Sequence, residues 1–450
     1  MNSRTFRIGG IRPDDNKITA NKPVVSVGVP AQAVFPLSQH IGAPAIPIVK
    51  KGDKVKVGMQ IVKADGFVSA PVHSSVSGTV LRIDKVIDTS GYNQSAIIIN
   101  VDGDEWEEGV DRSDTLETLE AHPEITADEI VKRVKKAGII GMGGAGFPTY
   151  IKLRPSAENK LSCVIINAVE CEPYITSDYR LMLEHADEIL VGMRLLMKAA
   201  GVEKGYIGIE DNKPDAISLF IDKTKGCSEI EIVSLKQKYP QGGEKQLIDA
   251  VLRRQVPAPP AIPAVVGALV QNVGTAFAVY QAVMKNKPLI ERCVTVTGKK
   301  LSRPGNFFVR IGTPLKVVLD KCGGLPEGRN KLLAGGPMMG KALMSDEVPI
   351  CKNMNCVTVL SGPDIMRGKS GPCIRCAKCV NVCPMGLEPY LLATVSFLHD
   401  WEKAERCGII SCLECGACQY TCPANRPMLD NIRLGKFAVL GMVKSRNIKK

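Results

Sequence analysis

The sequence predicts a multidomain chain that combines α/β and α+β units, and three observations lead to this class. The chain has 450 residues, 45% of them apolar, which is more than one hydrophobic core organises. Short strand-like runs fill roughly the first hundred residues, whereas strands and helices alternate further along. Nine of the sixteen cysteines lie between positions 373 and 422. We therefore expect four consecutive units, over residues 1–112, 113–288, 289–355 and 356–450.

Charge and hydropathy restrict the classes of partner. The formal net charge is +12, but lysine and arginine are scattered and only 5% of residues are aromatic, so nucleic-acid binding is not expected. No stretch is long and apolar enough for a transmembrane helix, and the amino terminus lacks the apolar segment of a secretory signal. These features predict a cytosolic or peripheral protein. The segment after Asp430 contains basic residues and no acidic ones. It is either a solvated tail or a surface that contacts lipid or an acidic neighbour.

The first unit, residues 1–112, is predicted to consist of short β-strands. In KKGDKVKVGMQIVKADG and FVSAPVHSSVSGTVLRI, apolar residues roughly alternate between glycine turns. This pattern resembles a β barrel-sandwich hybrid of the biotinyl/lipoyl type, in which carrier proteins present a modified lysine at a hairpin tip. The span 61–69 is too short for such a tip, so Lys63 is expected to be a surface residue and not a carrier.

The second unit, residues 113–288, is predicted to be an α/β domain with a parallel sheet. LSCVIINAVE (161–170) is typical of a buried parallel strand, and GYIGIED (205–211) predicts another. Between them, residues 180–201 have the pattern of one long amphipathic helix that ends at a glycine. Thr126 is expected to begin an earlier helix. Alternation of strands and helices indicates a parallel sheet.

The last two units differ from the second in pattern. CVTVTGKKLSRPGNFFVRIGTPLKVVLDKCGG returns to strands with one short helix, which predicts a small α+β unit over residues 289–355. The final unit, residues 356–450, combines cysteine motifs with the helical segment LEPYLLATVSFLHDWEKAER. That segment is longer than the connection in compact bacterial ferredoxins, and it favours a helical dicluster fold.

Two copies of one cysteine pattern dominate the final unit. CIRCAKCVNVCP and CLECGACQYTCP share a spacing in which three thiolates bind one iron-sulfur cubane and the fourth cysteine binds the neighbouring one. The pattern predicts two 4Fe-4S clusters, one on Cys373, Cys376, Cys379 and Cys422, the other on Cys412, Cys415, Cys418 and Cys383. Zinc or free buried thiols are the alternatives, although zinc sites usually pair two C-x2-C knuckles. Disulfides are not expected in the cytosol. Three of the cysteines outside the pattern are expected to be structural: Cys351, Cys356 and Cys407.

The loop GMGGAG (141–146) has the G-x-G-x-x-G spacing of dinucleotide-binding turns. Such turns follow a strand and open a helix, whereas VKRVKKAGII before this loop has a helical pattern and FPTYIKLRP after it contains two prolines. These neighbours weaken the Rossmann interpretation, and Glu170 only imitates the ribose-binding acid. A merely structural glycine turn is the alternative.

Three segments in order resemble the NADH-oxidising flavoprotein subunit of respiratory complex I: GMGGAGFPTYIKL, NAVECEPYITSDYR and YPQGGEKQLI. The resemblance implies a Rossmann-like flavin domain whose glycine loop holds the phosphate of FMN and whose neighbouring residues meet FMN or NADH. By position it assigns Gly141, Gly143, Gly144, Gly146, Phe147, Lys152, Asn167, Glu170, Glu172, Tyr239, Gly242, Glu244, Asn272 and Thr275. Phe147 is placed against the nicotinamide nucleotide. The sequence departs from that family at Val169, where the family has Asp, and at Gly243, where it has the first of two glutamates.

The order of all four units resembles the C-subunit family of the Rnf complex, a membrane-bound NADH:ferredoxin oxidoreductase that translocates Na+ or H+. FRIGGIRP, PLSQHIGAPA and GGPMMG extend the match, and we assign no chemistry to His40 within it. The resemblance implies that the third unit is a β-grasp domain of the SLBB type and the fourth a helical dicluster ferredoxin domain.

The same resemblance implies the activity. NADH exchanges hydride with non-covalent FMN, and single electrons then pass through two 4Fe-4S clusters to other Rnf subunits and to ferredoxin, without a catalytic acid or base. The protein is expected to be peripheral, on the cytoplasmic face of the membrane, and NAD+ reduction is the reverse direction. Two alternatives are a corrinoid (cobalamin) reductase of propanediol utilisation, which joins the same cofactors, and an electron-wire subunit that has lost flavin binding.

Overall fold

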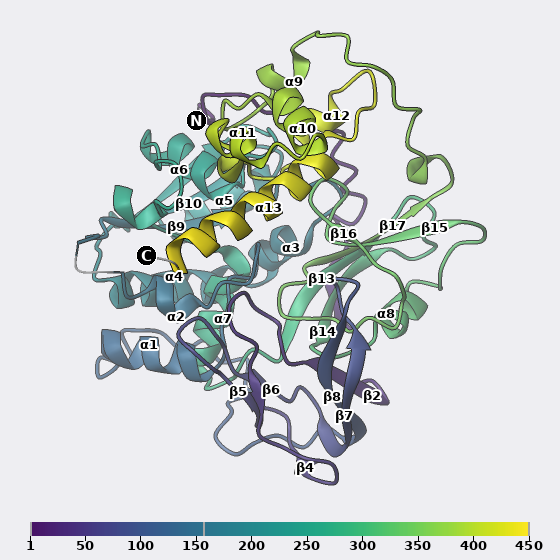
Figure 1. The fold of residues 1–450 in the computed structure, drawn as a ribbon. Coiled ribbons are helices and arrows are strands. Elements are labelled where there is room, and N and C mark those ends of the chain that lie inside the picture. The colour runs from purple at the N-terminus through teal and green to yellow at the C-terminus, as the bar shows by residue number, and fades with distance from the viewer. Residues whose placement is uncertain (1, 156–157, 449–450) are drawn as a thin grey trace.

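The N-terminal unit is built from two small antiparallel sheets (Figure 1), in a computed structural model that describes residues 2–155 and 158–448. One sheet has the order β2-β8-β7-β4 and the other β3-β5-β6. Their strands are β2 (Gln32–Pro36), β3 (Ile46–Pro47), β4 (Lys54–Val55), β5 (Gln60–Lys63), β6 (Val72–His73), β7 (Ser77–Ile87) and β8 (Asn93–Gly103). Alternate apolar side chains such as Phe35, Ile61 and Ile97 are buried between the sheets. Lys63 is exposed at the end of β5, as expected.

The first residues do not join this unit. Strand β1 (Val24–Ser26) pairs in parallel with a strand of the third sheet. Residues 4–20, which we call the N-terminal strap, run across the second unit, where Arg4 forms a bridge with Leu235 and Ile11 with Tyr239. The N-terminal sheets therefore begin at β2, later than the boundary predicted at residue 1, because the strap finds its backbone partners in the other units.

The second unit contains a four-stranded parallel sheet of order β11-β10-β9-β12, which confirms the predicted α/β class. Apolar residues of its strands, such as Ile166 and Ile207, are buried because helices cover both faces. The strands are β9 (Cys163–Ala168), β10 (Gly205–Glu210), β11 (Ile230–Leu235) and β12 (Ala268–Asn272). The helices are α1 (Ala127–Lys136), α2 (Thr149–Lys152), α3 (Ser177–Glu184), α4 (Ala186–Ala200), α5 (Pro214–Lys223), α6 (Glu244–Leu252), η1 (Pro263–Val266) and α7 (Val273–Met284).

Helix boundaries in this unit follow local side-chain chemistry. Thr126 caps α1 by accepting a hydrogen bond from the backbone N–H of Glu129, as predicted. The single helix predicted over residues 180–201 is wrong in one respect, because it consists of α3 and α4 with a break at His185. The His185 ring packs 4.7 Å from the ring centre of Phe277, so tertiary packing fixes the break.

The third unit is a six-stranded mixed sheet of order β1-β14-β13-β17-β15-β16 with one helix against it. This confirms the small α+β unit. Its elements are β13 (Glu291–Thr297), β14 (Gly305–Arg310), α8 (Leu315–Lys321), β15 (Asn330–Ala334), β16 (Lys341–Ala342), β17 (Cys356–Ser361) and η2 (Gly362–Ile365). Strand β17 lies beyond the predicted boundary at 355, yet it pairs with both β13 and β15, so the unit extends to Ser361.

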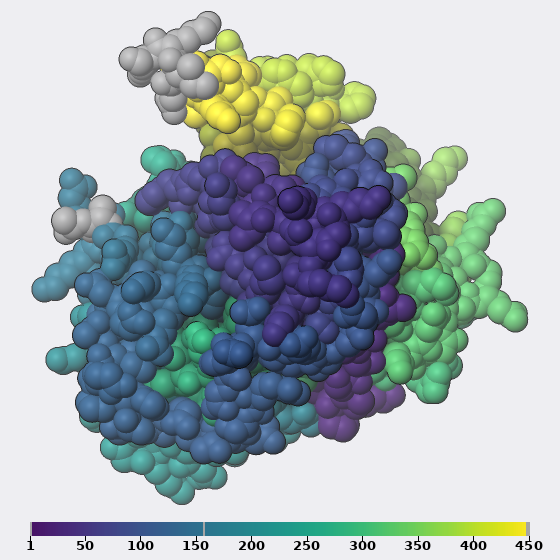
Figure 2. Space-filling model, turned by 90° about the horizontal axis from the view of Figure 1, so that it is seen from below, coloured from purple at the N-terminus to yellow at the C-terminus, as the bar shows by residue number. Residues whose placement is uncertain are grey.

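The C-terminal unit is helical and forms a separate lobe, drawn in yellow and light green in Figure 2. It contains α9 (Lys378–Asn381), α10 (Pro389–Phe397), α11 (Trp401–Arg406), η3 (Ile409–Ser411), α12 (Ala417–Tyr420) and α13 (Met428–Ile448). The helical segment between the cysteine motifs is interrupted at His399, whose φ is 59°. Within residues 2–155 and 158–448, no helix combines the length and apolar character that a membrane crossing needs.

Candidate flavin and iron-sulfur site

The glycine loop lies between α1 and α2, and not between a strand and a long helix, as its neighbours predicted. Residues 143–145 are exposed at its tip, and their backbone N–H groups donate to no acceptor in the described part of the chain. A Cβ added at Gly143 would lie 2.8 Å from the side-chain nitrogen of Asn272, whereas one at Gly144 would meet open space. Free N–H groups in an open glycine loop fit an anion such as a phosphate.

Three hydrogen bonds fix the shape of this loop. Gly141 N donates to Phe147 O at 2.8 Å, which closes the loop on itself. Met142 N donates to the hydroxyl of Thr275 in the first turn of α7 at 3.0 Å. The guanidinium of Arg292, from β13 of the third unit, donates to Met142 O at 3.3 Å. The loop is therefore held by both the second and the third unit.

A chain of polar contacts extends from the loop to the first turn of α3. Asn272 caps α7 and donates from its side chain to the carboxylate of Asp178 at 2.6 Å. Burial, followed by the nearby charge of Glu170, raises the pKa of Asp178. The Glu170 carboxylate accepts the backbone N–H groups of Asp178 and Tyr179, at 2.7 and 3.3 Å, so it caps α3.

Two further contacts bring the remaining loop-side residues together. Lys152, in α2, forms an ion pair of 2.7 Å with Glu244 at the start of α6. Asn167, at the end of β9, donates to Gly242 O at 2.8 Å. The carboxyl ends of β9 and β12 thus meet the glycine loop and the 242–244 turn, which is the edge where ligands of parallel sheets bind.

Two of the assigned residues, Glu172 and Tyr239, are engaged at the boundaries with other units. One Glu172 carboxylate oxygen accepts the backbone N–H groups of Met338 and Met339, at 2.6 and 3.1 Å, in the GGPMMG segment of the third unit. Tyr239 donates its hydroxyl to Cys415 O at 2.7 Å, in the C-terminal unit. These two side chains join the second unit, which we call the flavin-like unit, to its neighbours.

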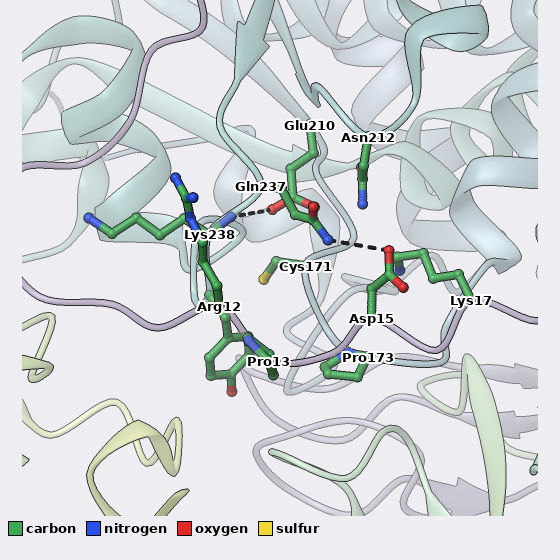
Figure 3. A pocket seen from close by; sticks show the side chains of 11 residues that line it. Arg12, Pro13, Asp15, Lys17, Cys171, Pro173, Glu210, Asn212, Gln237 and Lys238 are labelled. Carbon is green, nitrogen blue, oxygen red and sulfur yellow. Dashed lines mark hydrogen bonds between the residues drawn. The ribbon is translucent and has the colours of Figure 1, made fainter. Parts of the chain in front are cut away.

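The N-terminal strap crosses the other half of this sheet edge, above β10 and β11. Figure 3 shows the small polar pocket there, in which Gln237 donates to Asp15 at 3.3 Å and the backbone of Lys238 donates to Glu210 at 3.3 Å. The ammonium of Lys17 donates to three backbone carbonyls of the loop after β9, those of Glu170, Glu172 and Ile175, at 3.0, 3.3 and 2.6 Å. The strap therefore orders the segment that carries Glu170 and Glu172.

Four of the predicted cluster cysteines line one apolar pocket in the C-terminal lobe: Cys383, Cys412, Cys415 and Cys418. Leucine, methionine, proline and isoleucine side chains form most of the remaining wall. Backbone N–H groups of Leu387 and Glu414 point at the sulfurs of Cys383 and Cys412, at 3.3 and 3.4 Å. Thiols from both motifs, an apolar lining and N–H groups that donate to sulfur fit an iron-sulfur cluster. We call these four the inner cysteines.

The other four cysteines lie closer to the surface and are called the outer cysteines. Cys373 and Cys376 are exposed, while Cys379 and Cys422 are partly exposed. The pKa of Cys379 is raised, mainly by burial and to a smaller extent by the charge of Cys422. Cys379 belongs to the first motif and Cys422 to the second, so residues of both motifs lie near each other here. No three His, Cys, Asp or Glu side chains within the described ranges are grouped to hold a single metal ion.

Sequence reasoning missed Lys17 and Arg292. Arg292 is buried, and burial lowers its pKa to about 10. An arginine within the apolar strand pattern of residues 291–297 is a signal that could have drawn attention to it. Lys17 carries no such signal, because its three acceptors are more than 150 residues away in sequence.

Comparison with known proteins gives the family of the chain. Residues 5–104 match the RnfC barrel sandwich hybrid domain, residues 134–281 the Nuo51 FMN-binding domain and residues 293–342 the SLBB domain. The chain is 41% identical over 445 residues to the C subunit of the Na(+)-translocating ferredoxin:NAD(+) oxidoreductase complex of Acetobacterium woodii, a match that covers 98% of this chain and 99% of that protein. The chain belongs to the C-subunit family of Rnf complexes.

Other members of the C-subunit family are similar over most of their length. The C subunit of the proton-translocating ferredoxin:NAD(+) oxidoreductase complex of Clostridium ljungdahlii is 43% identical over 404 residues, 89% of this chain and 86% of that protein. The C subunit of the ion-translocating oxidoreductase complex of Rhodobacter capsulatus is 40% identical over 433 residues, 95% of this chain and 82% of that protein. The matched domains confirm the barrel-sandwich, FMN-binding and SLBB types that the resemblance implied.

Proposed function

We propose that this protein oxidises NADH, or reduces NAD+ in the reverse direction, and exchanges single electrons with other Rnf subunits and through them with ferredoxin. FMN, when bound, accepts a hydride and releases electrons one at a time. The observation that carries the proposal is the pairing of an open glycine loop with a cavity of four cysteines in one chain. The names of the relatives and the FMN-binding domain match support it.

The residues of the loop would bind and orient the flavin. The N–H groups of residues 143–145 would hold its phosphate, and the first turn of α7 beneath them adds favourable charge. Lys152 lies close enough to Glu244 to pair with it, and would supply a cation on this side of the sheet edge. Phe147 is partly exposed beside the loop, where the proposal places the nicotinamide nucleotide. No side chain needs to transfer a proton for hydride exchange.

The inner cysteines would hold the 4Fe-4S cluster nearest to the flavin, and the outer cysteines the second one. Tyr239 bonds Cys415 O, and the Gln246 side chain of α6 donates to Pro384 O at 3.2 Å, next to Cys383. These contacts place the flavin-like unit against the inner cavity. Because Cys373 and Cys376 are exposed, the outer cluster would be the point of exchange with a partner. We also propose that the protein is attached peripherally to the cytoplasmic face of the membrane.

An anaerobic optical titration of the iron-reconstituted protein with NADH tests this function, combined with identification of the flavin released from a parallel sample. We expect FMN in the extract and bleaching of both flavin and cluster absorption. Lys152→Met should lower flavin retention, whereas the matched variant Lys160→Met, at an exposed position, should not. Clusters that form without flavin and do not respond to NADH would support the flavin-free electron-wire alternative.

A further inference from the structure

The loop that carries the outer cysteines is exposed and basic. Residues 366–378 are exposed except for Gly371, and no acidic residue occurs from position 365 to 387. The loop contains four cations: Arg367, Lys369, Arg375 and Lys378. The excess of positive charge therefore lies around the two most exposed cluster ligands.

Most of these cations have no acidic partner. Arg367 pairs with Asp430 at 2.8 Å. In the ranges that the structure describes, the side chains of Lys369, Arg375 and Lys378 form no ion pair with a carboxylate. Exposed unpaired charges of one sign generate a field that extends about 8 Å into physiological salt and attracts a partner of opposite sign.

The same loop carries two exposed apolar side chains. Ile374 lies between the first two outer cysteines and is 65% exposed, and Met366 at the start of the loop is 73% exposed. Apolar residues surrounded by charged residues are the usual anatomy of a protein-protein interface.

We propose that residues 366–378 form a docking surface for an acidic electron-carrier protein domain. This rests on the proposed function, in which electrons cross the surface at the outer cysteines. The cations steer an acidic domain toward this face, and Ile374 and Met366 contact it once it is bound. An anionic membrane is a different partner for the same charges, but the cluster ligands Cys373 and Cys376 within the face favour a redox protein.

The test uses two small haem proteins as probes, acidic cytochrome b5 and basic cytochrome c. Oxidation of one NADH to NAD+ releases one proton and reduces two ferric haems to ferrous haems, one electron each, so reduction is followed in the haem spectrum. Binding of oxidised cytochrome b5 is measured separately by calorimetry. The variant carries Arg375→Glu and Lys378→Glu, and the matched control carries Lys50→Glu and Lys51→Glu on the exposed surface of the N-terminal unit.

For the wild type and the control, reduction of cytochrome b5 should slow at least about tenfold between about 0.01 M and about 0.3 M salt. In the variant at low salt, both the reduction rate and the affinity for cytochrome b5 should fall about tenfold or more, while cytochrome c reduction should rise. Equal behaviour of the variant and the control toward cytochrome b5 would overturn the proposal. Loss of binding to phosphatidylserine vesicles in the variant, with unchanged cytochrome b5 kinetics, would assign the loop to a membrane surface instead.

The outcome is separable from that of the proposed function. NADH bleaching and iron content are measured in every variant, and both should be unchanged by substitutions in the docking loop. If NADH fails to reduce even the wild type, the proposed function is wrong, and the protein is then reduced photochemically before it is mixed with cytochrome b5. The rate at which the photoreduced protein reduces cytochrome b5 is then compared between low and high salt, and between the wild type and the variant.

Discussion

The packing of the GGPMMG segment over Glu172 should weaken as pH rises, because it buries an ionisable carboxyl. The Glu172 carboxylate is the acceptor for the backbone N–H groups of Met338 and Met339. Burial raises the pKa of this carboxyl to about 7, from an ordinary value of 4.5, although the two N–H donors and Lys17 oppose the change. Burial outweighs the two N–H donors, so the environment that the docked segment creates around Glu172 favours the protonated form. Below pH 4.5 the carboxyl is protonated whether or not the segment is docked, and docking carries no penalty.

The magnitude follows from these two pKa values. Between pH 4.5 and about 7 the undocked state loses its proton first, so docking becomes progressively weaker, and above about 7 the loss is complete. The full loss is roughly 3 kcal/mol at ~1.4 kcal/mol for each unit of pKa, and this is an upper bound because the Glu172 side chain is only half-buried. Between about pH 6 and 8 the expected loss is ~1.4 kcal/mol, which is about tenfold in the docking equilibrium.

Native-state hydrogen exchange measures this equilibrium at the two donors themselves. Protection of the Met338 and Met339 amides is compared between the wild type and Glu172→Gln at each pH, which cancels the intrinsic pH dependence of exchange. We expect the protection ratio to fall about tenfold between about pH 6 and 8, while the amide of Ile207, inside the parallel sheet, shows no difference. A ratio that does not change with pH would refute the assignment of the raised pKa to Glu172.

Three further predictions test the site. Gly143→Ala should lower both stability and flavin retention, because its Cβ would lie 2.8 Å from a side-chain nitrogen. Gly144→Ala should lower only flavin retention and leave thermal unfolding unchanged, because its Cβ would meet open space. Released flavin and melting curves measure the two effects. Cys415→Ala should remove about half of the bound iron, and Cys407→Ala should remove none, by iron analysis and electron paramagnetic resonance. Lys17→Met removes three charge-assisted hydrogen bonds, and we expect a loss of about 2–4 kcal/mol that shows as lower thermal stability of the flavin-like unit, with unchanged iron content.

The parts of the site that were predictable are those in which spacing alone fixes the chemistry. The cysteine spacing predicts which thiols of the two motifs share a cluster, and the pocket that Cys383 lines with three cysteines of the second motif is compatible with that prediction. The prolines and the helical pattern around 141–146 predicted that the glycine loop does not follow the Rossmann pattern. Both signals are local in sequence, so no knowledge of the tertiary packing was needed.

The remaining features depend on contacts between distant segments. Nothing near Lys17 indicates that its ammonium binds carbonyls more than 150 residues away, and β1 joins the third sheet although it precedes the first unit in sequence. The position of Glu172 in the flavoprotein motif predicts a cofactor contact, but it does not predict that the carboxylate also accepts two N–H groups of another unit. Residue type and spacing do not determine which of several polar groups a carboxylate meets.

Several contacts that the sequence did not reveal lie at one location, where the strap, the second and third units and the C-terminal lobe meet. Tyr239 of the second unit, Met338 of the third and Cys415 of the C-terminal lobe pack in one small apolar cluster with Ile11 of the strap. Gly10 of the strap also donates to the carbonyl of residue 382, beside an inner cysteine. Electron transfer between two cofactors requires a fixed distance between them. A single contact between each pair of units would not keep that distance constant. The strap, Glu172 and Tyr239 each join the second unit to a different part of the chain at or beside this cluster, and together they hold the inner cysteines against the flavin-like unit.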